Sequence, residues 1–438
     1  MAQLQNPTCD IGQRPLTGVI LVNGQQCFIE IAGLPLWQRQ LLTGHKAGIR
    51  HWSILAWHDT TALRDAIARD KRLQAITCEV YHLADSSPAR LAAQLPTEDI
   101  LLMACEAVFD HHVLLEWQGR QGNLLGITST RPAVPVVLEN DRVIAISPAS
   151  TATHGCGSAG ILSCSAAHLE LMLQQSWQSL QQASSPFTVL LSHLLDTSVV
   201  QTIDLSKRFW RPIVPPFTTH ASAAERALVQ QLGRQGDSFI VRQINRRISQ
   251  ALSKRLLHTA ISPNQITLCS ALIGISGALL LAQPFYLSQV LGSLLFLCST
   301  IIDGCDGEVA RLTFQESDFG GKLDVMMDNV VHLFLFPGIA LGLYRATHDI
   351  SALVLGGLTV GGVLISMAAY LPSLWRRSAN RRPPSRTHES LASRDFSYLL
   401  LLLALVGKLE WFLWATAIGT YLFAGALFIV SRLRQRQT

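Results

Sequence analysis

Four aspartates lie within residues 303–328, beside apolar segments that are long enough to span a bilayer: Asp303, Asp306, Asp324 and Asp328. Residues three or four apart are neighbours on a helix, so each pair of aspartates would share one helical face. Two facing helices would therefore gather four carboxylates around one point. Carboxylates beside hydrocarbon are costly and usually mark function. Four hard oxygen ligands are typical of Mg²⁺ or Mn²⁺ sites, and four acids suit two ions better than one.

Small and basic residues accompany these aspartates. Gly307 and Ala310 have almost no side chain, so a nucleotide could approach that helix closely, and Gly320 offers the same at the start of the next helix. Arg311 offers a planar fork for phosphate oxygens. Phosphoryl transfer depends on positioning and charge neutralisation more than on covalent help, so these residue types suit it. The alternative is that the acids only line a water-filled cavity or an ion path.

The spacing DxxDGxxARx₈GxxxDxxxD resembles the signature of the CDP-alcohol phosphotransferase (CDP-alcohol phosphatidyltransferase) family at all of its fixed positions. The resemblance covers residues 236–434. It implies a membrane enzyme, a transferase of substituted phosphate groups, that carries the group from a CDP-alcohol to an acceptor alcohol and releases CMP. It also implies a homodimer and two divalent ions, with Asp303, Asp306 and Asp324 as metal ligands. Asp328 would be both a ligand and the general base.

Composition divides the chain into two parts. Residues 1–235 have the mixed composition of a soluble domain, whereas residues 266–431 are dominated by apolar runs. The net charge is +5, and arginine clustered beside apolar spans indicates membrane orientation and contact with an anionic surface, not nucleic-acid binding. Nine cysteines without a CxxC pair argue for a reducing compartment and against a disulfide framework. No signal peptide is visible.

Six membrane spans are expected, and Arg or Lys is dense in the four regions that would share one side of the membrane. The positive-inside rule makes that side cytoplasmic. We therefore expect a multi-pass protein of the inner (cytoplasmic) membrane whose active site and N-terminal domain face the cytoplasm. The expected spans are Ile266–Gln283, Phe285–Ile302, Val325–Tyr344, Ile350–Leu371 and two short spans within Phe396–Val430 that turn near Gly407.

Residues 237–262 precede the first span and are expected to form an amphipathic interfacial helix, because apolar residues recur at helical spacing among arginines. An ordinary linker helix is the alternative. Pro263 then suits the first turn of span one. The family often carries a Pro-Asn-x-x-Thr element here, close to the cytidine, so the resemblance makes Asn264 and Thr267 candidate CDP contacts. A simple helix cap would also explain this element.

Two further residues were weighed as site candidates. Arg394, in the arginine-rich loop between spans four and five, could bind the phosphate of an acceptor, since Arg394-Asp395 resembles a pair in family members that use inositol phosphate. Orientation signalling alone would also explain that arginine. His332 lies one turn beyond Asp328, and we interpret it as a histidine packed in the bundle and not as a ligand.

The N-terminal part, residues 1–211, is expected to be a soluble α/β three-layer domain fused to an all-α bundle of six transmembrane helices at residues 263–438. Residues 212–236, rich in Pro, Ser and Thr, are the expected linker. The predicted strands are Gly18–Asn23, Trp52–Trp57, Ile100–Ala104, Val136–Leu138 and Val143–Ile146, with a helix between Leu36 and Gly48.

The order of these elements resembles sugar-phosphate nucleotidyltransferases, in particular the cytidylyltransferase half of bifunctional inositol-phosphate cytidylyltransferase/di-myo-inositol-phosphate-phosphate synthases. Gly33-Leu34-Pro35-Leu36 and the strand before Glu106 carry the resemblance. The basic glycine-rich loop expected after the first strand is missing, because Asn23–Phe28 is short and holds no basic residue. Trp210 is followed by Arg211, where a second metal-binding Asp is expected. We therefore expect a degenerate nucleotidyltransferase-like domain.

The leading hypothesis is a membrane CDP-alcohol phosphotransferase. The donor would be of the CDP-diacylglycerol type, as in phospholipid biosynthesis, or of the CDP-inositol type, and the acceptor could be inositol or inositol phosphate. The alternatives are an enzyme resembling di-myo-inositol-phosphate-phosphate synthase with a soluble product, a non-enzymatic membrane scaffold and an ion-coupled transporter. Neither non-enzymatic class needs the glycines, Ala310 and Arg311 together with the acids.

Overall fold

The computed structural model describes residues 17–57, 60–95, 99–129, 134–147, 156–232, 245–375 and 396–435. The chain divides into two compact units, Met1–Ala227 and Leu228–Thr438. Two expectations fall outside the described residues: the loop that carries Arg394, and the first part of the predicted interfacial helix.

A nine-stranded mixed sheet forms the centre of the first unit, in the order β5-β4-β1-β6-β11-β8-β12-β10-β9. The strands β5, β4, β1 and β6 are parallel to one another, and β11 runs antiparallel to both of its neighbours, β6 and β8. The bounds are β1 Thr17–Val22, β4 His51–Ala56, β5 Thr77–His82, β6 Ile100–Ala104, β8 Leu124–Thr128, β9 Val134–Glu139, β10 Arg142–Ile146, β11 Gly157–Cys164 and β12 Val200–Asp204.

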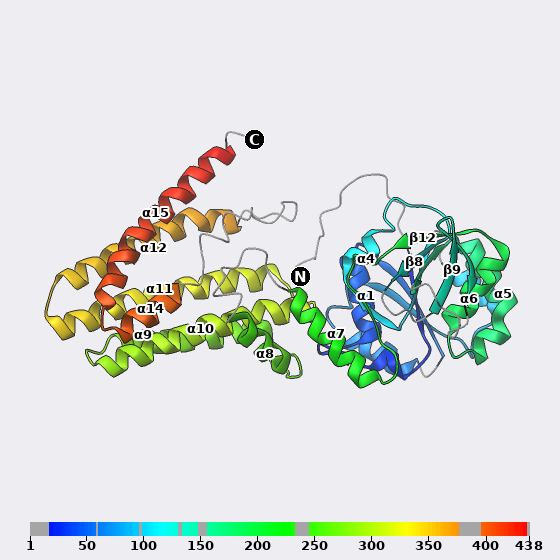
Figure 1. Cartoon of the computed structure of the whole chain (residues 1–438), viewed down its shortest axis with the longest axis horizontal. Coiled ribbons are helices and arrows are strands. Elements are labelled where there is room, and N and C mark those ends of the chain that lie inside the picture. The colour runs from blue at the N-terminus through cyan, green and yellow to red at the C-terminus, as the bar shows by residue number, and fades with distance from the viewer. Residues whose placement is uncertain are drawn as a thin grey trace. The chain divides into compact units, whose positions relative to one another are not determined.

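Helices cover both faces of this sheet (Figure 1). On one face, Val19 and Leu21 of β1 share a buried cluster with residues of α5 and α6. On the other face, the ring of Trp52 lies against Gly18 of β1 and Gly44 of α1, where any larger side chain would overlap it. The helices are α1 Leu36–Lys46, α2 Thr61–Arg69, α3 Pro88–Gln94, α4 His111–Leu115, α5 Ala166–Gln182, α6 Pro186–Thr197 and α7 Phe217–Gln231.

Each predicted strand of the first unit is present, within two residues at most of its expected ends. The expected linker differs from the structure, because α7 fills most of residues 212–236. Glu225 of α7 accepts a hydrogen bond from the backbone N–H of Ala32 (3.2 Å), and the N–H of Ile213 donates to the carbonyl of Glu106 (2.7 Å). This segment is therefore largely a packed helix, and the division between the units falls within α7.

The second unit is helical, and its long helices α9, α10 and α11 lie roughly alongside one another (Figure 1). Glycines let these helices approach closely: a Cβ on Gly277 of α9 would lie 2.7 Å from the carbonyl oxygen of Gly292 on α10. Their bounds are α8 Arg246–Leu256, α9 Pro263–Leu281, α10 Tyr286–Leu312, α11 Asp318–Thr347, α12 Ser351–Trp375, α14 Phe396–Leu405 and α15 Leu409–Gln435.

Three helix connections lie at one end of this bundle. The guanidinium of Arg345, near the end of α11, donates to the carbonyl of Ala282 just after α9 (3.0 Å). The hydroxyl of Tyr286, at the start of α10, donates to the carbonyl of Leu405 at the end of α14 (2.9 Å). The motif aspartates on α10 begin 17 residues after Tyr286, which is about 25 Å along a helix. The α14–α15 turn therefore lies at the end of the bundle away from those aspartates.

Within the described residues, four helices are long and apolar enough to cross a bilayer: α9, α10, α11 and the first part of α12. The apolar α14 has ten residues, and α15 follows it after the turn expected near Gly407, whose φ is +69°. Of the six predicted spans, the structure thus supports four by length and composition, and the remaining two stay a prediction.

Candidate functional site

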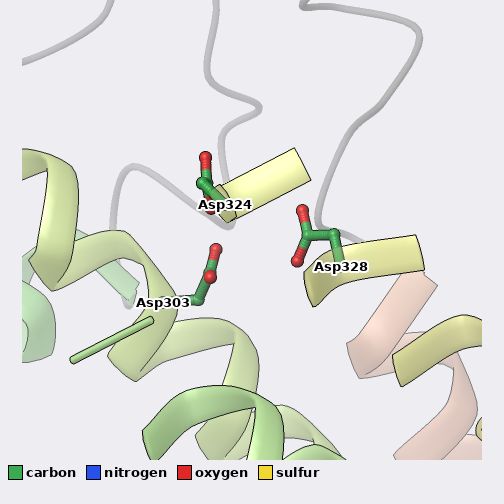
Figure 2. Close-up of side chains that lie close together, drawn as sticks. All are labelled: Asp303, Asp324 and Asp328. Carbon is green, nitrogen blue, oxygen red and sulfur yellow. The ribbon is translucent and has the colours of Figure 1, made fainter. Parts of the chain in front are cut away.

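Three carboxylates meet where the end of α10 faces the start of α11. Asp303 of α10, with Asp324 and Asp328 of α11, each place one carboxylate oxygen within 4.8 Å of the other two. Figure 2 shows these side chains gathered between the two helices. Asp324 and Asp328 are four residues apart and so project from one face of α11. Asp303 is buried and Asp328 is exposed. Hard oxygen donors in this arrangement fit a divalent ion.

Asp306 lies outside this group of three. The hydroxyl of Thr267 on α9 donates to Oδ2 of Asp306, and the backbone N–H of Gly307 donates to Oδ1. Helical spacing alone predicted that all four acids would surround one point. The structure brings three of them together and turns the fourth, which is 8 % exposed, toward α9.

Asn264 and Gly320 are brought together from different helices. Ser262 caps α9 in a reciprocal pair with Gln265, and Pro263 occupies the first turn, so the chain enters α9 in a fixed direction. A Cβ on Gly320 would lie 3.2 Å from Oδ1 of Asn264 and 3.1 Å from Oγ of Ser317. Two of the predicted nucleotide contacts therefore share one small space beside the carboxylates of α11.

The remaining candidates of the motif lie on the last turns of α10. The guanidinium of Arg311 folds back over Gly307, since a Cβ there would lie 3.3 Å from Nη1 of Arg311. Ala310 is half-buried. A larger residue in place of Gly307 would press on the guanidinium, so the glycine leaves room for the arginine as well as for a ligand.

Ser270 is a site residue that the sequence reasoning missed. Its hydroxyl lies 3.5 Å from Oδ1 of Asp303 and 2.8 Å from the carbonyl of Thr267. Its own carbonyl accepts a hydrogen bond from Ser299 of α10 (2.7 Å). The available signal was the spacing of Thr267 and Ser270, which puts two small polar residues on one face of an otherwise apolar helix.

His332 is surrounded by aromatic rings. The ring centroids of Phe296, Phe336 and Phe396 lie 6.4, 5.8 and 5.6 Å from that of His332. This environment agrees with the interpretation of His332 as a packed histidine of the bundle. It is not one of the residues that form the carboxylate group.

In the first unit, the chain leaves β1 through the short 3-10 turn Gln25–Phe28, where the resemblance predicts a phosphate-binding loop. The thiol of Cys27 in this turn donates to the carbonyl of Cys105, just after β6 (3.7 Å). The neighbouring Glu106 is half-buried, and loss of hydration raises the pKa of its carboxyl group. The turn is thus closed against the end of the next parallel strand, and it holds no basic residue.

Residues 260–433 match the family model of CDP-alcohol phosphatidyltransferases. Three curated relatives bear the name "Bifunctional IPC transferase and DIPP synthase". The Archaeoglobus fulgidus protein is 40% identical over 135 residues, which are 31% of this chain and 26% of that protein. The Aquifex aeolicus protein is 30% identical over 177 residues, which are 40% of this chain and 39% of that protein. The Rubrobacter xylanophilus protein is 30% identical over 302 residues, which are 66% of this chain and 64% of that protein.

These matches confirm the resemblance that the aspartate motif indicated. The alignment with the Rubrobacter xylanophilus relative covers 66% of this chain, which is more than the whole second unit, so it reaches into the first unit as well. The chain spans less than two thirds of the length of each of these three relatives.

Two solved structures match part of the chain at low sequence identity and low TM-score. The inositol-1-phosphate CTP transferase from T. maritima is 14% identical with a TM-score of 0.38, and the match covers 49% of this chain and 98% of that one. A putative glucose-1-phosphate thymidylyltransferase from Bacillus anthracis is 10% identical with a TM-score of 0.40, and the match covers 48% of this chain and 95% of that one.

Proposed function

We propose that the protein is an integral membrane CDP-alcohol phosphotransferase, which transfers a substituted phosphate from a CDP-alcohol to an acceptor alcohol and releases CMP. The observation that carries the proposal is the meeting of Asp303, Asp324 and Asp328 from two helices that the motif joins. Asn264 and Gly320 adjoin this group. The family match over residues 260–433 supports the same reaction class.

The carboxylates would hold divalent ions, Mg²⁺ or Mn²⁺. Three hard oxygen donors fit one such ion directly, and we propose that Asp306 completes a site for two. The Thr267 hydroxyl donates a hydrogen bond to Oδ2 of Asp306. To bind an ion through this oxygen, Asp306 would either keep that hydrogen bond as well or give it up. When bound, two ions supply charge neutralisation for the diphosphate of the donor and for the CMP that leaves.

The chain's own residues would do the positioning and the proton transfer. Asn264 and Thr267 are proposed to contact the CDP group, which would lie against Gly307, Ala310 and Gly320. Arg311 would hold phosphate oxygens. Asp328 is exposed whereas Asp303 is buried, so Asp328 is the acid that an acceptor hydroxyl can reach, and it would take the proton of that hydroxyl as general base.

The donor would be of the CDP-diacylglycerol or CDP-inositol type, and the acceptor inositol or an inositol phosphate. The names of the curated relatives support an enzyme of the di-myo-inositol-phosphate-phosphate synthase kind, with a soluble product, as the second candidate. In either case Arg394, which lies outside the described residues, would bind the phosphate of the acceptor. A non-enzymatic scaffold gains no support from the gathered carboxylates.

The proposed setting is the inner membrane, with six spans, the site and the first unit on the cytoplasmic side, and a homodimer of two chains. The four candidate spans support the membrane setting, and the α14–α15 turn at the end away from the site is consistent with two further spans. In domain terms, we propose residues 1–211 as a degenerate nucleotidyltransferase-like domain, followed by the interfacial helix within 237–262 and the transferase domain at 263–438.

The test is to incubate the purified full-length protein with Mg²⁺ and a panel of CDP-alcohols and acceptors, and to identify products by mass. We expect CMP and one phosphodiester product from one donor and acceptor pair. The Asp328→Asn variant, with an unchanged elution volume in detergent, should release no CMP. If wild-type protein released none with any pair, or if Asp328→Asn kept full turnover, the proposal would be wrong.

A further inference from the structure

Beside Asp303 and Asp306, α10 carries a third buried acid, which has no part in the reaction proposed above. Glu308 is 4 % exposed, and both of its carboxylate oxygens accept hydrogen bonds from α8. The hydroxyl of Ser249 donates to Oε1 (3.1 Å) and that of Ser253 donates to Oε2 (2.8 Å). The guanidinium of Arg246 lies 3.8 Å from Oε1. One carboxylate on α10 thus connects to three residues of α8.

The face of α8 that meets α10 is small and polar. Asn245, Ser249 and Ser253 follow one another at four-residue spacing, so they form one stripe, and all three are buried. The thiol of Cys305 on α10 adds a contact to the carbonyl of Ser249 (3.6 Å). Ile248 of α8 is 48 % exposed and so adds little to this contact. Asn245, just before α8, also accepts a hydrogen bond from Tyr398 of α14. The hydrogen bonds to Glu308 are therefore the polar part of the attachment of α8 to α10.

The position of α8 also sets the position of the start of α9. Only residues 257–262 separate the end of α8 from the first residue of α9, and Leu257 among them is buried. Asn264 and Thr267 lie on the first turns of α9, against Gly320 and Asp306. A displaced α8 would therefore move the residues proposed to contact the CDP group, without touching the three gathered carboxylates.

We infer that Glu308 is a positioning residue: by binding Ser249 and Ser253 it fixes α8 on α10, and through α8 it holds Asn264 where the CDP group binds. The assignment of this role rests on the proposed function, whereas the attachment of α8 does not.

The attachment is tested by thiol labelling of the full-length protein with all native cysteines replaced. Ser253 is fully buried, so a Ser253→Cys variant should react slowly with a polar maleimide. Adding Glu308→Ala should release α8 and raise the labelling rate by at least about tenfold, since local opening controls such access. Arg247→Cys, on the exposed side of α8, should react equally fast in both backgrounds. An unchanged rate at residue 253 would overturn the inference.

The positioning role is tested by steady-state kinetics. Glu308→Ala and the double variant Ser249→Ala/Ser253→Ala should each raise KM for the CDP-alcohol about tenfold, equivalent to about 1.4 kcal/mol, with kcat changed by less than about threefold. Glu308→Gln should lose less, because its amide can accept from one hydroxyl and donate to the other. Glu410→Ala, an exposed acid on α15, is the matched control and should match wild type.

The outcomes separate the two claims. A fall in kcat with unchanged KM would overturn the positioning role, and so would wild-type KM in the double serine variant. If Glu308→Ala fails to fold, Glu308→Gln and the serine variant decide. If wild-type protein transfers nothing from any donor, the proposed function fails, and the labelling experiment still decides whether Glu308 holds α8.

Discussion

At the residue scale, four aspartates with matching sequence spacing have different surroundings. Asp303 is 6 % exposed beside Ser270, whereas Asp328 is exposed to solvent. The carboxylate of Asp306 accepts hydrogen bonds from the Thr267 hydroxyl and from the backbone N–H of Gly307. These differences match the proposed roles, in which the buried acids hold charge and the exposed acid meets the acceptor.

Asp303→Ala or Asp324→Ala should lower CMP release by at least about a thousandfold, because each removes one of three carboxylates that meet at one point. Activity in both wild type and controls should disappear in excess chelator and return with Mg²⁺. Asp318→Ala, an exposed acid at the start of α11, should retain wild-type turnover. Near-normal turnover in either of the first two variants would count against the metal site.

The adjacent glycines of α11 offer a matched pair. A Cβ on Gly320 would approach Asn264 and Ser317 at 3.2 and 3.1 Å, while a Cβ on Gly321 would meet nothing within 4 Å. Gly320→Ala should therefore displace Asn264 and raise KM for the CDP-alcohol about five- to tenfold, whereas Gly321→Ala should leave KM unchanged. Equal KM values for both variants would show that Asn264 does not contact the donor.

The sequence predicted the residues of the site better than their partners. The spacing of Asp324 and Asp328 puts both on one face of a helix, and the structure confirms that they meet Asp303. Spacing within one helix says nothing about what lies across from it, so the bond from Thr267 to Asp306 was not predictable. The sequence gives no signal at Glu308 itself, and only the four-residue repeat of small polar residues in α8 could have indicated its role.

At the scale of elements, the strands named above were predictable to within two residues of their ends, whereas the ends of the long apolar helices were not. β1 and β6 are continuous apolar runs, whereas the edge strand β5 has mixed burial and carries no such signal. The predicted second span ended at Ile302, but α10 continues to Leu312. The length of an apolar run limits how much of a helix can lie in the membrane, but it does not limit the helix itself. The helix α10 therefore continues past Asp303 and Asp306.

Close approach of α9 and α11 depends on glycine. A Cβ on Gly342 would overlap the carbonyl oxygen of Leu281, whereas one on Gly357 of α12 would meet nothing within 4 Å. Gly342→Ala should therefore destabilise the bundle by about 1–3 kcal/mol through overpacking. Gly357→Ala should be neutral or slightly stabilising, since alanine favours helix. Denaturation in detergent, followed by circular dichroism, would measure both, and equal midpoints would contradict the packing described for α9 and α11.

At the scale of the whole molecule, the first unit should not catalyse nucleotidyl transfer. Its β1 runs into a turn without a basic residue, and Arg211 follows Trp210 at the position where a second metal-binding Asp is expected. The full-length protein with CTP, Mg²⁺ and an alcohol phosphate should release pyrophosphate no faster than a blank, while an active cytidylyltransferase does so under the same conditions. Sustained pyrophosphate release would refute this expectation.

Membrane orientation is testable with single cysteines in a chain cleared of native ones. Ser317, between α10 and α11, lies at the end of the bundle that carries the site, and Thr347 and Lys408 belong to connections at the other end. In intact cells, an impermeant thiol reagent should label Thr347→Cys and Lys408→Cys but not Ser317→Cys, which should react only after lysis. Protection of Lys408→Cys alone would remove the last two spans from the six-span arrangement.

The closed turn Gln25–Phe28 bears on where the protein obtains its substrate. If the first unit cannot make a CDP-alcohol from CTP and an alcohol phosphate, every turnover consumes a CDP-alcohol made by a separate enzyme. The reaction would then compete with other consumers of that donor pool, and its flux in the cell would follow the pool's size. Overproducing the protein alone should leave the product level nearly unchanged, while raising donor synthesis should increase it.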